Sequence, residues 1–203
     1  MAHIPDGVLS TPVLMAGAAL SAGGVALGLR GLDPARIPRV AVLSAVLFVA
    51  SLVHFPAGLA SVHLLLNGLA GIVLGWAVFP AMLVALLLQA VLFGFGGLVV
   101  LGVNTLDMAL PALLAGALFR RLWSPETGPR RAALLGGLAG GGAVLLSALM
   151  VALALAASGR AFETAAGLVV ATHAPVMAVE AAFTAALVSL LARVKPEMLA
   201  RPA

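Results

Sequence analysis

The sequence predicts an all-α, polytopic membrane protein with about seven transmembrane helices, and two observations support this fold class. Of its 203 residues, 63% are hydrophobic and 9% are charged, whereas soluble domains have about 45–50% apolar and about 25% charged residues. The apolar residues form continuous runs near the ~20 residues that a spanning helix needs, without the alternation of a membrane β-barrel. Soluble enzymes and disordered chains are excluded, and the lack of cysteine excludes disulfides and thiolate metal sites.

Charged, proline and glycine residues divide the chain into seven apolar stretches. The first begins at Ser10-Thr11-Pro12, where a capping hydroxyl precedes proline. It is not a cleavable signal, because no basic n-region precedes it and Arg30 follows it. The third and fourth stretches nearly touch at Phe79-Pro80, and two stretches are long enough to tilt or to include a non-spanning turn. The stretches are residues 9–29, 40–54, 60–77, 79–95, 99–119, 132–157 and 164–192.

Basic residues orient this topology. With seven helices, ten of the eleven Lys and Arg residues fall on one side, which the positive-inside rule makes cytoplasmic. The ten are Arg30, Arg36, Arg39, Arg120, Arg121, Arg130, Arg131, Arg193, Lys195 and Arg201, and Arg160 lies opposite. We therefore expect the N-terminus outside the cell membrane and the C-terminus in the cytoplasm. The net charge of +4 then reflects topology anchors, not a nucleic-acid surface.

The four histidines all fall in the outer half of this topology, which suggests a metal site. His3 precedes the first helix, His54 ends the second, His63 opens the third, and His173 lies about nine residues into the seventh. An imidazole within a membrane helix is a functional candidate, whereas a histidine at a helix end, such as His54, is also typical of a solvated residue. Asn67 follows His63 by four residues, so we expect both on one helix face.

His3 has the most specific chemistry of the four. A histidine close to a free amino terminus can bind a metal through the amine, a deprotonated backbone amide and the imidazole, a nearly planar nitrogen set that suits Ni(II) or Cu(II). Pro5 and the turn signal Asp6-Gly7 allow residues 3–7 to fold back into the bundle.

Further polar residues are candidates for orienting the ligands or for purely structural roles. Asp6 also suits a turn and Asn104 also suits a helix cap, and Glu180, near the middle of the membrane, is expected to hydrogen-bond a neighbouring helix. The candidates for orienting the ligands are Asp6, His54, Asn67, Asn104, Asp107 and His173.

An ordered set of motifs spans nearly the whole chain. The motifs are His3-Ile4-Pro5-Asp6-Gly7 with Leu9-Ser10, Ser61-Val62-His63-Leu64 with Asn67-Gly68-Leu69, Gln89 with Phe93-Gly94-Phe95-Gly96-Gly97-Leu98, Leu101-Gly102-Val103-Asn104 with Asp107-Met108, and His173-Ala174-Pro175 followed by Glu180. Together they resemble the substrate-capture (S) components of nickel/cobalt energy-coupling-factor (ECF) transporters, the NikM/CbiM family. The Ser-Val-His and Asn67-Gly68 segments are more similar to its nickel branch.

The resemblance implies a ligand set. In that family, the histidine beside the N-terminus supplies amine, amide and imidazole nitrogens, and the third-helix histidine supplies a fourth. Carried over, the ligands are Ala2, His3 and His63, with residues 1–8 as the metal-binding segment of a single membrane domain, 1–203. The family begins Met-His, whereas this chain begins Met1-Ala2-His3. Removal of Met1 leaves the family spacing; retained Met1 would let three backbone nitrogens and His3 complete the square, with His63 axial or outer.

The resemblance also implies a function: high-affinity capture of Ni(II) at the outer face and its delivery by an ATP-driven importer, with Co(II) as the alternative cargo. The chain is expected not to be an enzyme, because its one lysine, Lys195, precedes Pro196 and cannot form a phosphate-binding loop. ATP hydrolysis then belongs to partners. The implied partners are a membrane coupling (T) subunit and cytoplasmic ATPase (A) subunits, with a small accessory membrane subunit as a further candidate.

Two other classes of function remain. The same bundle could be the S component or permease for a small organic nutrient, although eight Phe and two Trp supply few rings for stacking. A self-contained ion channel or proton-coupled transporter would need several intramembrane carboxylates, and Asp107 and Glu180 alone qualify. Titration with metal separates these classes.

Overall fold

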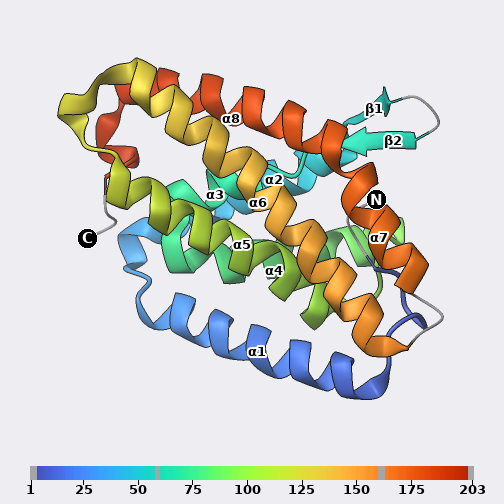
Figure 1. Ribbon diagram of the computed structural model, residues 1–203. Helices are drawn as coiled ribbons and strands as arrows, with labels where there is room; N and C mark the ends of the chain where they lie inside the picture. The colour runs from blue at the N-terminus through green and yellow to red at the C-terminus, as the bar shows by residue number, and fades with distance from the viewer. Residues whose placement is uncertain (1–3, 58–59, 160–162, 201–203) are drawn as a thin grey trace.

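The apolar stretches fold into a bundle of α-helices, which Figure 1 shows packed side by side in a computed structural model. The structure describes residues 4–57, 60–159 and 163–200, with the backbone alone at 54–57, 60–63 and 163–167. The helices are α1 (Thr11–Arg30), α2 (Ile37–Leu52), α3 (Asn67–Leu74), α4 (Val78–Phe93), α5 (Leu101–Leu122), α6 (Gly128–Ser158), α7 (Glu163–Thr172) and α8 (Ala174–Val194). Short 3-10 helices are η1 (Pro34–Arg36), η2 (Gly75–Ala77), η3 (Pro125–Thr127) and η5 (Pro196–Met198), and one hairpin joins β1 (His54–Ala57) to β2 (Ala60–His63).

The predicted all-α membrane bundle is confirmed, with six to seven spanning helices where about seven were expected. Within the described residues, six helical segments are long and apolar enough to cross a membrane, counting α3, η2 and α4 as one segment, Asn67–Phe93. Large apolar side chains cover the outside, as a surface facing lipid requires; Leu138, for example, is 65% exposed.

The chain turns back between α3 and α4. Gly75 has φ 57° and ψ −129°, a left-handed conformation that favours glycine. Residues on both sides of the turn meet in one apolar cluster, in which Leu66, before α3, joins Leu86 of α4. Because α3 has only 8 residues, about 12 Å of helix, it is a half-length seventh pass, and the boundary predicted at Phe79-Pro80 lies at Gly75.

The hairpin was not predicted and replaces two helix ends. The second helix was expected to reach residue 54 and the third to begin at residue 60, but α2 ends at Leu52 and α3 begins at Asn67. The strands are antiparallel, with His54 opposite His63, and Leu66 has φ 51°, which interrupts a helix. The placement of His63 on one helix face with Asn67 is therefore wrong.

The last stretch, expected as one helix over 164–192, is two helices. α7 ends at Thr172, α8 begins at Ala174, and His173 lies at the junction rather than inside a helix. The physical reason is Pro175, because a proline ring lacks an N–H group and clashes with the carbonyl four residues earlier.

The described ends of the chain lie at opposite ends of the bundle. Ile4 belongs to one apolar cluster with Val151 near the end of α6, whereas Leu199 belongs to a cluster with Ala132 near its start. The intervening helix is about 30 Å long, which is the thickness of a bilayer core. A chain that crosses the membrane an odd number of times has its two ends placed in this way.

Glycines let α3 approach its neighbours closely. A Cβ atom on Gly71 would overlap the Ala112 carbonyl of α5, and one on Gly68 would lie 2.6 Å from the Cα of Gly140 in α6. Packing through small residues is typical of membrane helices, where there is no hydrophobic force between helices. These contacts fix α3 in the centre of the bundle.

Candidate metal site

The N-terminal segment is fastened to α5 by Asn104. The Asn104 Oδ1 accepts a hydrogen bond from the Ile4 N–H at 3.0 Å, and its Nδ2 donates to the Ile4 carbonyl at 3.0 Å. Both residues are 3% exposed. One amide side chain thus pairs with both backbone groups of Ile4, as a neighbouring strand would, and fixes the residue that follows His3.

Asp6 attaches the same segment to the start of α5. Its Oδ1 accepts from the Val100 N–H at 2.9 Å and its Oδ2 from the Val99 N–H at 3.4 Å, where a helix dipole favours a carboxylate. The Asp6 N–H donates to the Gly96 carbonyl at 3.2 Å. Gly97 has φ 153°, and a Cβ there would overlap the Asp6 carboxylate. The glycine-rich loop is therefore shaped to receive Asp6.

The segment is also held at its far end, where the Ser10 N–H donates to the Ser158 Oγ at 3.1 Å. Folding back of the N-terminal segment, expected for residues 3–7, is confirmed for residues 4–7. Ala2 and His3 lie outside the described residues.

The hairpin that carries His54 and His63 begins at the same end of the bundle. Aromatic rings connect the two regions: Phe48, near the end of α2, lies 5.8 Å from Phe93, whose ring centroid lies 5.9 Å from that of Phe95. Phe95 directly precedes the loop that binds Asp6. Figure 1 shows the strands and the first blue segment at one side of the molecule.

Glu180 of α8 holds the chain that follows His63. It is fully buried, and its Oε1 accepts hydrogen bonds from the N–H groups of Leu65 and, at 2.9 Å, Leu66. At the other end of α3, the Arg120 guanidinium donates to the carbonyls of Gly71 and Ile72 at 2.8 Å. Each end of this short helix therefore meets the charge that its dipole favours.

Glu180 was expected to hydrogen-bond a neighbouring helix; its partners are instead the N–H groups of Leu65 and Leu66, in the segment that precedes α3. Its connection to the His63 segment was missed by the sequence analysis; the available signal was a carboxylate in mid-membrane, which needs a partner.

The other candidate residues have their own partners or positions. Asn67 donates from Nδ2 to the Ser147 Oγ at 3.0 Å, which joins α3 to α6. The His173 Nδ1 lies 2.6 Å from the Val169 carbonyl, so Nδ1 donates the proton in this hydrogen bond. Asp107 is buried one turn below Asn104, and its Oδ2 has no hydrogen-bond partner among the described residues. The hydrogen bonds of Asp6 and Asn104 thus join the N-terminal segment to α5, whereas those of Asn67 and His173 have other partners.

Wherever the structure describes side chains, no three His, Asp or Glu residues converge on a metal site. The predicted ligands Ala2, His3 and His63 belong to the remainder of the chain.

The six helical segments among the described residues that are long and apolar enough to cross a membrane place the chain in the class of multi-pass membrane proteins. Comparison with known proteins shows which family of membrane proteins the chain belongs to. The family described as the cobalt uptake substrate-specific transmembrane region matches residues 3–198. The chain belongs to this family; it is a membrane subunit for transition-metal uptake and not an enzyme.

Individual relatives agree with this assignment. A Haemophilus influenzae protein named as a candidate metal transport protein is 43% identical, over 98% of this chain and 97% of that protein. The fused nickel transport protein NikMN of Rhodobacter capsulatus is 34% identical, over 98% of this chain and 64% of its own length. The cobalt transport protein CbiM of Geobacter sulfurreducens is 32% identical, over 98% and 62%. The chain thus spans somewhat under two thirds of the last two proteins.

Solved structures share the fold. A truncated transition metal transporter superposes with a TM-score of 0.75 at 23% identity, covering 96% of this chain and 98% of that one. A second transition metal transporter gives a TM-score of 0.67 at 24% identity, covering 95% and 93%.

Proposed function

We propose that the protein captures Ni(II) at the outer face of the cell membrane, with its N-terminus outside and its C-terminus in the cytoplasm. The ligands are the Ala2 amine, the His3 amide and imidazole nitrogens, and the His63 imidazole, and residues 1–8 form the metal-binding segment. The observation that carries this proposal is the pair of hydrogen bonds between Asn104 and Ile4, because they anchor the chain immediately after His3.

Anchoring matters because a free tail must lose conformational freedom when it binds a metal, which weakens binding. Asp6 and Asn104 order the segment in advance, and Glu180 orders the residues that follow His63. Removal of Met1 makes Ala2 the terminal amine. Two ordered chain segments at one end of the bundle can then supply four nitrogens to one ion.

Nickel is favoured over cobalt because a planar nitrogen set suits Ni(II). Co(II) is the alternative cargo, and the family includes proteins named for each metal. As the S component of an ECF importer, the protein works with a membrane coupling subunit, cytoplasmic ATPase subunits and, as a further candidate, a small accessory membrane subunit. We assign ATP hydrolysis to those partners.

Titration of the purified protein with Ni(II) tests the proposal, with visible absorption as the readout. A free N-terminus should give a tight, stoichiometric, diamagnetic complex, and an N-terminal extension should abolish it. The same extension at the C-terminus is the matched control. Equal affinity in both tagged forms would contradict the amine ligand, and mass spectrometry that finds Met1 intact would contradict the assignment to Ala2.

A further inference from the structure

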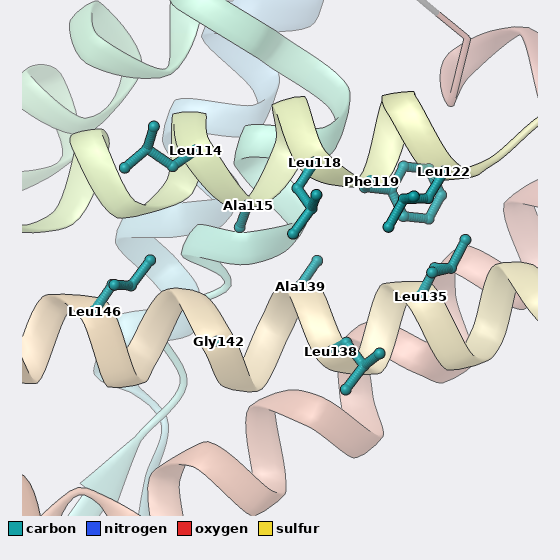
Figure 2. Close-up of a pocket in the computed structure, with 10 residues that line it drawn as sticks. All are labelled: Leu114, Ala115, Leu118, Phe119, Leu122, Leu135, Leu138, Ala139, Gly142 and Leu146. Atoms are coloured by element: carbon teal, nitrogen blue, oxygen red, sulfur yellow. The ribbon is translucent and has the colours of Figure 1, made fainter.

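A groove with entirely apolar walls runs along the surface between α5 and α6, outside the candidate metal site. Its volume is about 190 Å³. Figure 2 shows side chains from both helices facing it. The large lining residues include Leu114, Leu118 and Leu122 of α5, and Leu135, Leu138 and Leu146 of α6.

The groove lies on the surface that faces lipid. Leu118 is 58% exposed and Leu138 is 65% exposed, so hydrocarbon surrounds these side chains in a membrane. Along α6 the lining extends from Leu135 to Leu146, about 16 Å of helix. This length is half of a bilayer core of ~30 Å, so the groove extends along one leaflet.

Both walls of the groove end in an exposed arginine. Arg121 follows Leu118 by three residues on α5, and Arg131 precedes Leu135 by four residues on α6. Residues at these spacings share a helix face, so the two cations flank the end of the groove. Two acidic residues lie at this end: Glu126 of η3, whose Oε2 accepts a hydrogen bond from the Ser124 Oγ at 2.7 Å, and the exposed Glu197 of η5. Arg120 points to α3 instead.

We propose that this groove binds an anionic phospholipid, with one acyl chain along the leucines and the phosphate between Arg121 and Arg131. Apolar walls match the acyl chain, and two cations match the phosphate. Basic sites at the cytoplasmic ends of membrane helices attract anionic head groups in this way. The site is independent of the metal and of the N-terminal segment.

Gly142 provides a substitution that tests the groove. It lies among the lining residues, and a Cβ atom there would meet nothing within 4 Å. A side chain at this position therefore starts in open space, and Gly142→Leu is chosen to occupy the groove. Gly23, exposed on α1, likewise has nothing within 4 Å, so Gly23→Leu is the matched control.

The experiment compares phosphatidylglycerol with phosphatidylcholine of the same acyl chains, titrated into the purified full chain and counted by native mass spectrometry. We expect one tightly held phosphatidylglycerol, bound about tenfold or more tightly than phosphatidylcholine. Gly142→Leu should remove both lipids from this site, the double variant Arg121→Gln, Arg131→Gln should remove only the preference, and Gly23→Leu should change neither.

Unchanged retention in Gly142→Leu would overturn the proposal, as would an unchanged preference in the arginine variant. Loss of a co-purifying protein partner from Gly142→Leu, with lipid retention intact, would assign the groove to a partner helix and also overturn it. Nickel titration of the same variants should match the unsubstituted protein, which separates this test from that of the metal site.

Discussion

Replacing Asn104 by alanine tests the role of the anchored N-terminal segment. The substitution removes the two hydrogen bonds to the backbone of Ile4, both 3.0 Å long. It leaves the α5 backbone unchanged, since alanine is the best helix former. The released segment can expose its backbone groups to water, so it is expected to leave the bundle rather than unfold it.

The size of the effect follows from those two bonds. Each is worth a net stabilisation of about 0.5–1.5 kcal/mol, so the anchored form loses about 1–3 kcal/mol relative to the released form. At about 1.4 kcal/mol for each factor of ten, the ratio of anchored to released form falls roughly 5- to 140-fold. Because apparent Kd scales inversely with the population of the competent form, the Kd for Ni(II) rises by up to this factor once the released form predominates.

Calorimetric titration with Ni(II) measures this change. Thr105→Val is the matched control, because Thr105 is fully buried on the same turn but its hydroxyl bonds to the Leu101 carbonyl of its own helix. That variant should keep the affinity of the unsubstituted protein. An Asn104→Ala protein with unchanged thermal stability and unchanged affinity would refute the role of the anchored segment.

Three further expectations concern the same site. Gly97→Ala should weaken Ni(II) binding about tenfold or more, because its Cβ would overlap the Asp6 carboxylate. Gly94→Asn is the control and should leave Ni(II) binding unchanged, because Gly94 is a left-handed position with open space around it. Equal calorimetric titrations of the two variants would argue against the Asp6 anchor. Glu180→Ala should lower the melting temperature and weaken Ni(II) binding, because two buried N–H groups lose their acceptor at a cost of about 1–3 kcal/mol each. Glu180→Gln retains an oxygen acceptor and should restore most of the melting temperature and of the Ni(II) affinity. A Glu180→Ala protein with unchanged melting temperature and affinity would contradict this role of Glu180. Ni(II) affinity should fall as pH decreases from about 8 to about 5, because protons compete with the metal for imidazole and amine nitrogens. A flat profile in titrations across this range would exclude nitrogen ligands of this kind.

The bundle could be predicted because long apolar runs interrupted by charges, Gly and Pro permit little besides membrane helices. The hairpin was not predicted, because the mostly apolar residues 60–77 were assigned to one helix although Ser61, His63 and Asn67 interrupt the run. A distant residue also holds the chain that follows the hairpin: the Leu65 and Leu66 N–H groups bond to Glu180, more than 110 residues later in the chain. A tertiary contact of this kind overrides the local pattern.

The candidate site was likewise predicted in part. Asp6 and Asn104 could be selected from the sequence because polar residues are costly in or beside membrane helices. Their partners could not, and Asn104, which also suited a helix cap, binds Ile4, 100 residues away. Pro175 could have predicted the helix break at His173, but the continuous apolar run on both sides favoured one helix.

Nickel-edge anomalous diffraction from crystals of the Ni(II)-loaded protein tests the central proposal most directly. We expect one strong peak, bonded to nitrogens of Ala2, His3 and His63, with Ile4 still paired to Asn104. A peak at any other place in the bundle, or a loaded state in which the N-terminal segment has left Asn104, would contradict it.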